Sequence, residues 1–331
     1  MSDSARHNLW APMPRPVIHQ DRSLTLCPKR RVTAWIRERV GRILLFVIAC
    51  SSVLAVLLIF LFIIKESIPF LRQYGVGAFL FGRQWLPVDH DHPRFGILAL
   101  MTGTLYVTLG ALCFTLPIGL LTAVFLSEMA SSPCRVVIKP LIEILSAIPS
   151  VVYGFFAALV LAPWMQNHLG FSSGTNALNA AMILSVMALP TVIHVAENAM
   201  SALERDLREA SFGLGATRAE TVFKVILPAA HRGIIAAMIL GMMRAVGETM
   251  VVWMASGNAS QIPTPWWDLS QSIRTMTTTI ASEMGEAAQG SLHRSALFAM
   301  GALLLIVTFI MNLTSEYFLK KAGHGASRNA T

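Results

Sequence analysis

Six long apolar runs divide the chain, and polar segments separate them. The runs cover residues 43–64, 96–126, 144–165, 177–195, 233–256 and 295–313. A helix of about 20 apolar residues crosses the hydrocarbon core of a bilayer. The pattern therefore predicts an all-α integral membrane protein with six transmembrane helices. The second run is too long for one upright span, so we expect it to tilt, to kink near Pro117 or to begin on the membrane surface. We expect the fourth to end near Pro190.

The composition supports a chain that has lipid around much of its surface. Of its 331 residues, 54% are hydrophobic and only 13% are charged, whereas a soluble domain has about 25% charged residues. The four cysteines form no CxxC pair, so the sequence indicates neither a disulfide framework nor a zinc site.

Lysine and arginine gather in alternate connections, and this sets the predicted orientation. Nine lie in residues 1–42, two in 127–143, five in 196–232 and three in the C-terminal tail. The connections between these hold fewer, with four in 65–95 and two in 257–294. Basic loops stay in the cytoplasm, so both ends of the chain are predicted to be cytoplasmic. The net charge of +8 then reflects topology, and we expect no nucleic-acid partner.

These boundaries predict five parts of the chain. They are a cytoplasmic tail with a short basic helix (1–42), a first span (43–64), an outer loop (65–95), a core of five spans (96–320) with a cytoplasmic loop at about 196–232, and a C-terminal tail (321–331).

The sequence offers little for catalysis. No GxxxxGK[ST] motif is present, because none of the six lysines precedes Ser or Thr, so the chain should not hydrolyse nucleotides by itself. The "DHDHP" run from Asp89 to Pro93 brings two imidazoles and two carboxylates together, which suits either a metal site or a solvated external loop. Alternating ligands in a turn define a coordination shell poorly, so we expect no bound metal ion. Since the catalytic and nucleotide-binding motifs are also missing, we expect no cofactor and no enzymatic activity.

The loop between the fourth and fifth runs reads "LREASFGLGATRAETVFKVILPAA" and predicts two short helices. Gly213 and Gly215 end the first helix. Thr217 and Glu220 have the spacing of a capping box at the start of the second, and Pro228 is expected to stop it. By itself this is either an amphipathic linker or a projection presented to a partner.

The spacing in this loop resembles the EAA-x3-G-x9-I-x-L-P signature of prokaryotic ABC-importer permeases. The match has Ser in place of the second Ala and Val in place of Ile. It comprises Glu209, Ala210, Ser211, Gly215, Val225, Leu227 and Pro228.

The resemblance implies that this loop docks on a separate ATPase subunit. Glu209 and Gly215 would be the docking residues, and Arg208 and Arg218 would supply polar contacts. The remaining coupling residues that the resemblance implies are Ala210, Leu227 and Pro228.

Three stretches, "EILSAIPSVVYGFF", "FGLGATRAETVFKVILPAA" and "RAVGETM" followed by "GNA", resemble the phosphate ABC transporter permeases. The long N-terminal tail and the stretch "IRTMTTTIASEMGEA" resemble the PstC type among them. The resemblance implies a multi-pass subunit of a bacterial inner membrane with a periplasmic 65–95 loop. Its partners would be a PstA-type permease, an ATPase dimer and a periplasmic phosphate-binding protein, with phosphate as substrate. The alternatives are a permease for another oxyanion or for a phosphate-containing solute, and an ion-driven secondary transporter or channel. The "SEMGEAAQGSLHR" stretch suits either a binding-protein contact or an ordinary exposed loop.

Two charges stand inside the fifth apolar run. If that run is one helix, Arg244 and Glu248 lie on one face and one turn apart. They are either an ion pair that locks two spans together or part of an oxyanion route, in which the guanidinium donates paired hydrogen bonds to phosphate. The resemblance implies the second role and implies that Gly247 admits a neighbouring helix.

A proline in the third run is the other candidate for the pathway. Pro149 and Ser150 either break the third span and free backbone groups toward the pathway, or belong to a helix that tolerates the proline.

Overall fold

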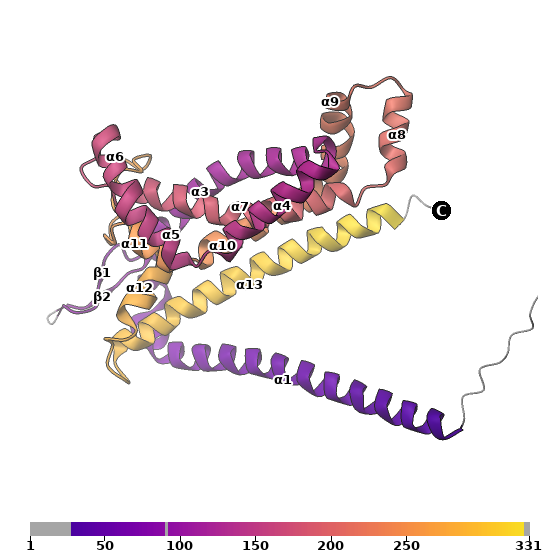
Figure 1. Cartoon of the computed structure of the whole chain (residues 1–331). Coiled ribbons are helices and arrows are strands. Elements are labelled where there is room, and N and C mark those ends of the chain that lie inside the picture. Colours follow the sequence, from indigo (N-terminus) through magenta and orange to yellow (C-terminus); the bar gives the residue numbers. More distant parts are fainter. Residues whose placement is uncertain (1–27, 90–91, 328–331) are drawn as a thin grey trace, which may run out of the picture. The chain divides into compact units, whose positions relative to one another are not determined.

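The computed structural model describes residues 28–89 and 92–327, and it describes side chains over 39–89 and 92–321 (Figure 1). The chain falls into two units, residues 1–59 and 60–331, of which the second contains the helical bundle.

Five helices of the described residues are long and apolar enough to cross a membrane, and a bent pair makes up to six. The all-α, six-span prediction is thereby confirmed. The five segments are Arg39–Tyr74 in helix α1 (Pro28–Tyr74), Leu98–Met129 in α3 (Leu98–Val124) and η1 (Phe125–Met129), α7 (Ala177–Ser201), Arg218–Gly247 in α9 (Arg218–Thr221), η3 (Val222–Ile226) and α10 (Leu227–Gly247), and Leu292–Lys321 in α13 (Leu292–Ser327). The bent pair is α4 (Ser132–Ala147) followed by α5 (Ser150–Phe156), η2 (Ala157–Leu161) and α6 (Ala162–Leu169).

Shorter elements occupy the connections. They are α2 (Val76–Phe81), an antiparallel hairpin of β1 (Trp85–Leu86) and β2 (Arg94–Phe95), α8 (Arg205–Gly213), α11 (Met250–Ala255) and α12 (Met276–Glu283). The α8–α9 segment lies at one end of the bundle, with the C-terminal end of α13 (Figure 1). The hairpin, α6 and α12 lie at the opposite end.

Helix α7 is the centre of the bundle and packs against α3, α4 and α10. Small side chains let these helices approach closely, as is usual where lipid removes the hydrophobic driving force between helices. Ala180 and Ala196 of α7 are fully buried. A methyl group added at Gly233 of α10 would collide with Ala199, so this contact requires glycine.

The ends expected near Pro190 and at Pro228 are wrong, because the helices continue through both prolines, and Pro117 likewise lies inside a helix. Pro117 is within α3, and Pro190 is within α7, which runs on to Ser201. Spanning helices tolerate proline because neighbouring groups satisfy the freed carbonyls. Pro228 does not stop its helix either. It follows a π-helical turn, η3, whose wider winding accommodates a residue without an N–H.

A cluster of aromatic side chains fills the end of the bundle opposite α8. Phe70, Phe79, Trp85 and Phe95 are buried there against the start of α13. Their rings meet mostly edge to face, with Phe70 and Phe95 centroids 5.4 Å apart. The hairpin and the connections of this end are therefore held in fixed positions.

An ion pair between a partly exposed lysine and a buried glutamate joins α4 to the central helix. Lys139 Nζ lies 2.8 Å from Glu197 Oε1, and the Glu197 side chain is 3% exposed. The second carboxylate oxygen, Oε2, has no hydrogen-bond partner among the described residues. The ammonium group of Lys139 therefore supplies the counter-charge that stabilises the buried Glu197 carboxylate.

We expect Lys139→Met to destabilise the chain by about 3 kcal/mol, because it leaves a buried carboxylate without a counter-charge. The double variant Lys139→Met, Glu197→Leu should recover most of this loss. Lys224→Met removes an exposed pair with Glu220 and is the control, with no measurable change expected. Thermal unfolding of the purified chain in detergent measures all three. Equal losses in the single and double variants would contradict the assignment.

Candidate functional site

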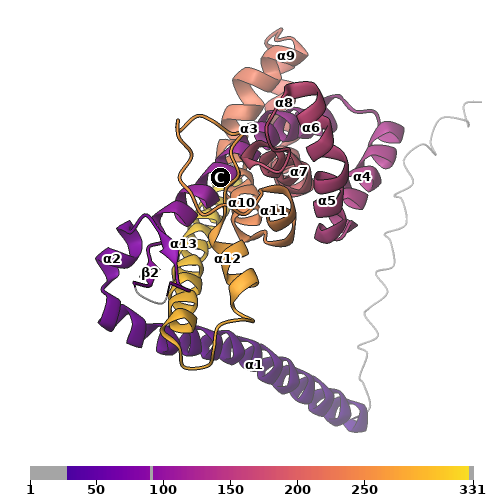
Figure 2. The same ribbon diagram turned by 90° about the vertical axis from the view of Figure 1, so that its left-hand side faces the viewer.

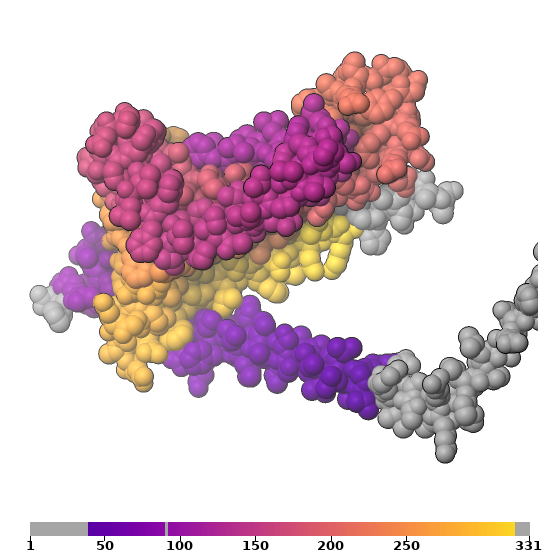
Figure 3. Space-filling model, in the orientation of Figure 1, coloured from indigo at the N-terminus to yellow at the C-terminus, as the bar shows by residue number. Residues whose placement is uncertain are grey.

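The turn between α8 and α9 projects from one end of the second unit (Figure 3). Gly215 has a φ of +83°, which L side chains rarely adopt. Leu214 beside it is 90% exposed. The expected capping box is confirmed, because Thr217 N donates to Glu220 Oε2 at 3.0 Å and Glu220 N donates to Thr217 Oγ1 at 3.3 Å. The segment Arg205–Thr221, called the coupling segment below, therefore contains a turn whose conformation is fixed by Gly215 and by the capping box.

A buried hydroxyl pair holds the two helices of the coupling segment together. Ser211 Oγ and Thr221 Oγ1 lie 2.9 Å apart, and both residues are buried. Ser211 is the position where the sequence departs from the Ala of the importer signature. The departure thus adds a hydrogen bond between α8 and α9.

The guanidinium of Arg208 ties the coupling segment to two spans. Its Nη2 and Nε donate to Glu128 at 2.8 and 3.1 Å, and Nη1 and Nη2 also donate to the Leu203 and Met200 carbonyls, each at 2.9 Å. Such a fork combines charge with fixed geometry. Arg208 is thus engaged inside the chain, and its acceptor Glu128 lies too far along the sequence for spacing to have indicated it.

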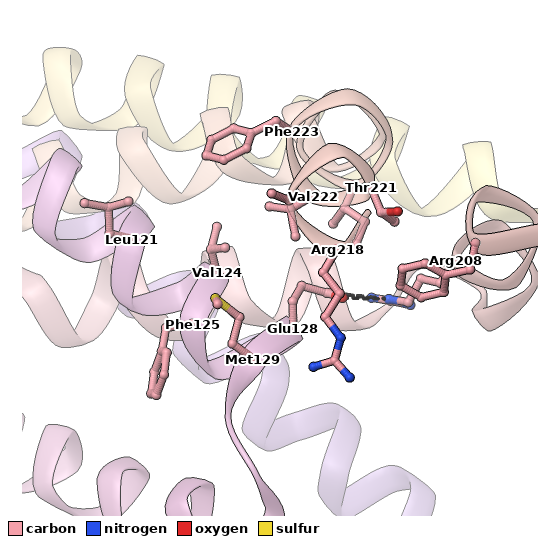
Figure 4. Close-up of a pocket in the computed structure, with 13 residues that line it drawn as sticks. Leu121, Val124, Phe125, Glu128, Met129, Arg208, Arg218, Thr221, Val222 and Phe223 are labelled. Atoms are coloured by element: carbon pink, nitrogen blue, oxygen red, sulfur yellow. Dashed lines mark hydrogen bonds and ion pairs between the residues drawn. The ribbon is translucent and has the colours of Figure 1, made fainter. Parts of the chain in front are cut away.

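A cavity of about 470 Å³ separates the coupling segment from the end of α3 (Figure 4). Apolar side chains such as Leu121, Phe212 and Phe223 line it, and Arg218 lies at its edge. Arg218 is exposed and has no ion-pair partner among the described residues. The guanidinium is therefore available to a partner.

The other predicted coupling residues lie on the surface of the same end. Glu209 and Ala210 are exposed on α8, and Pro228 is exposed at the start of α10. Leu227 is half-buried. The structure thus brings the predicted set to one end of the bundle but not into one pocket.

The fifth predicted span, 233–256, is not one helix. Helix α10 ends at Gly247, Glu248 is extended with φ −76° and ψ 135°, and α11 begins at Met250. Glycine is a poor helix former, and the chain leaves the helix there. The expectation of one continuous helix through Arg244 and Glu248 is therefore wrong, because Glu248 is the C-cap at which α10 ends. Among the described residues no ion pair joins them.

Both charges remain beside this break. Arg244 is exposed on the last turn of α10, and Glu248 is half-buried. Nothing within the described chain approaches Gly247, so the space that the missing side chain leaves is open.

The third predicted span, 144–165, is also broken. The α4 helix ends at Ala147, and the next helical run starts at Ser150 with a bend of 87°. Ile148 is extended because it precedes Pro149, which disfavours the α conformation. Tyr153 Oη donates to the Leu145 carbonyl at 2.7 Å and so satisfies one carbonyl that the break frees.

The two breaks are neighbours in space. Helix α5, after the first break, packs against α11, after the second (Figure 1). One hydrophobic cluster contains Tyr153, Ala245 and Val252, with Ile148 against it. The residues predicted for the pathway therefore meet at one interrupted region, with Pro149 exposed and Ser150 half-buried.

No group of three or more metal-ligating side chains occurs among the described residues. Two members of the "DHDHP" run, His90 and Asp91, lie outside them.

Comparison with known proteins now assigns the family. Residues 115–324 match the model for binding-protein-dependent transport system inner membrane components. The chain belongs to this family. Among similar proteins, the probable ABC transporter permease YqgH of Bacillus subtilis is 36% identical, over 84% of this chain and 89% of its own. The phosphate transport permease PstC of Haemophilus influenzae is 32% identical, over 84% and 90%, and PstC of Mesorhizobium japonicum is 32% identical, over 74% and 78%.

Solved structures support the fold of this permease. The inward-facing MetNI methionine ABC transporter has a chain with a TM-score of 0.52 and 18% identity, covering 68% of this chain and 95% of that one. The permease is thus a multi-pass inner-membrane component.

We expect Arg208→Lys to loosen the coupling segment of this permease, because lysine cannot replace the fork to Glu128. Deuterium exchange of residues 205–216 should become roughly ten-fold faster, the scale of one charged hydrogen bond. Arg205→Lys, on the exposed face of the same helix, is the control and should leave exchange unchanged. Unaltered exchange in Arg208→Lys would show that the fork does not hold the segment.

Proposed function

We propose that this permease forms the translocation pathway of an ATP-driven phosphate importer, as a subunit of the PstC type. The observation that carries the proposal is the joint presence of a built coupling segment at one end and two adjacent helix breaks beside Arg244 and Glu248. Several relatives over most of the chain are named as phosphate transport permeases, which supports the choice of substrate.

The coupling segment suits a docking surface for an ATPase. Leu214 and Gly215 form an exposed tip with no side chain on the glycine to obstruct a close contact. Glu209 and Arg218 offer exposed charges beside it. Arg208 holds the segment on the bundle rather than reaching the partner.

The same surface supports an orientation of the permease in the membrane. An ATPase partner places the α8 end in the cytoplasm, and the C-terminal end of α13 lies at that end too (Figure 1). This agrees with the basic connections of the sequence. The α6 and hairpin end is then periplasmic and faces a phosphate-binding protein, and a PstA-type permease completes the pathway.

Arg244 suits the role of the phosphate ligand. Its side chain is exposed within this chain, beside a break where main-chain groups leave the helix. A guanidinium donates two parallel hydrogen bonds to an oxyanion and cannot lose its charge at neutral pH. Glu248 at the break would limit entry of anions when the guanidinium is free.

We expect Arg244→Ala to abolish phosphate uptake and Arg244→Lys to lower it at least ten-fold, because lysine keeps the charge but not the fork. Arg232→Ala is the control, an arginine of the same helix that donates to the Lys321 carbonyl. Labelled phosphate uptake is measured at low concentration in cells without their own high-affinity importer, supplied with this chain and its partner subunits.

Excess sulfate tests the substrate in the same assay. Uptake that resists sulfate supports phosphate, whereas uptake lost to sulfate supports another oxyanion. Uptake without the ATPase subunit would favour an ion-driven transporter. Normal uptake in Arg244→Ala would contradict the assigned ligand.

We expect Gly215→Ala to weaken coupling to the ATPase about five-fold, because the positive φ costs an L residue about 1 kcal/mol. Gly215→Asn should be milder, since asparagine tolerates this conformation. Gly213→Ala, where the surroundings are equally open and φ is not positive, is the matched control. Retention of the ATPase on washed membranes is the measurement, and equal loss in Gly215→Ala and Gly213→Ala would exclude the turn as the cause.

A further inference from the structure

Helix α12, which belongs to the connection between two spanning segments, lies beside the break between α10 and α11 (Figure 2). Thr277 Oγ1 donates to the main-chain carbonyl of Glu248 at 3.0 Å. This is a contact between residues 29 positions apart, at the point where the fifth span is interrupted.

The Glu248 carbonyl requires such a donor. Glu248 is the C-cap of α10, and its ψ of 135° turns its carbonyl out of the helical ladder. A main-chain carbonyl left without a partner in a membrane costs several kcal/mol. The Thr277 hydroxyl supplies the bond that the interrupted helix does not, and it thereby fixes the backbone that carries the Glu248 carboxylate.

The start of α12 is itself held firmly. Thr275 and Thr278 form a reciprocal capping box, with Thr275 N donating to Thr278 Oγ1 at 3.1 Å. Met276 N donates to Thr104 Oγ1 of α3 at 3.1 Å. The Thr277 side chain is therefore presented from a helix start that is bound to a central span.

The far end of α12 is bound to the aromatic cluster. Glu283 Oε1 lies 2.8 Å from Arg274 Nη1, while its Oε2 accepts from Trp85 Nε1 at 2.9 Å and lies 2.8 Å from His293 Nε2. These partners come from the hairpin, the connection before α12 and the start of α13. Helix α12 thus joins three elements of the opposite end of the bundle to the break at Glu248.

We propose that Thr277 is a positioning residue of the translocation pathway, which fixes Glu248 and links it through α12 to the face opposite the coupling segment. This inference rests on the proposed function. Thr277 touches no substrate. It sets the direction in which the Glu248 carboxylate points. A movement of the residues around Glu283 would shift α12 and so change the position of that carboxylate.

The test uses the assembled importer and three isosteric or conservative variants. Thr277→Val removes the hydroxyl and keeps the shape, whereas Thr277→Ser keeps the hydroxyl. Thr279→Val is the matched control, because the Thr279 hydroxyl donates only to the Thr275 carbonyl of its own helix. Phosphate uptake per assembled complex is measured over a range of concentrations, with ATPase activity with and without the phosphate-binding protein.

We expect Thr277→Val to lower maximal uptake about five-fold, the scale of one hydrogen bond. The half-saturating phosphate concentration should stay unchanged, since capture by the binding protein precedes this step. Stimulation of the ATPase by the binding protein should fall in parallel. Thr277→Ser should restore both to within two-fold, and Thr279→Val should match the wild type.

Two results would overturn the inference. One is unchanged uptake and stimulation in Thr277→Val, and the other is an equal loss in Thr277→Val and Thr279→Val, which would indicate a folding defect of α12. Failure of the proposed function looks different, because the wild-type complex would then import no phosphate.

Discussion

The need to satisfy every main-chain polar group inside a membrane governs the design of this permease. Water is absent from the bilayer core, so each interruption of a spanning helix needs an internal partner. Among the described residues of the bundle, spanning segments are interrupted after Ala147 and after Gly247, and at each break a side-chain hydroxyl donates to one carbonyl that the helix leaves free. Tyr153 bonds the Leu145 carbonyl, and Thr277 bonds the Glu248 carbonyl. The chain can therefore carry irregular backbone where a substrate route needs it.

Hydrogen bonds between side chains and groups far apart in the sequence also fix the turn between α8 and α9. Arg208 joins α8 to Glu128 and to the end of α7, and Ser211 joins α8 to α9. Each bond connects the projecting segment to a span or to its own second helix. Under the proposed function, an ATPase that moved this segment would therefore also move the helices bonded to it.

Features that depend on local sequence could be predicted, and those that depend on distant partners could not. Apolar length indicated the spans, and Thr217 and Glu220 indicated a capping box because cap and partner are three residues apart. The break after Gly247 was missed, since its stabilising donor Thr277 lies 29 residues beyond Glu248. The ion pair between Lys139 and Glu197 could not be predicted either, because the two residues lie far apart in the sequence. Pro228 was misjudged because a π-helical turn, which no sequence pattern here announces, removes its usual cost.

That continuity at Pro228 has a consequence for how the two ends communicate. One helical run of 30 residues extends from Arg218 to Gly247, which is about 45 Å at 1.5 Å per residue. It begins in the coupling segment and ends on the turn that carries Arg244. A helix that stopped at Pro228 would have needed a joint between these points. The run from α9 through α10 therefore connects the coupling segment to the turn that carries Arg244, and the helix is first interrupted at Glu248.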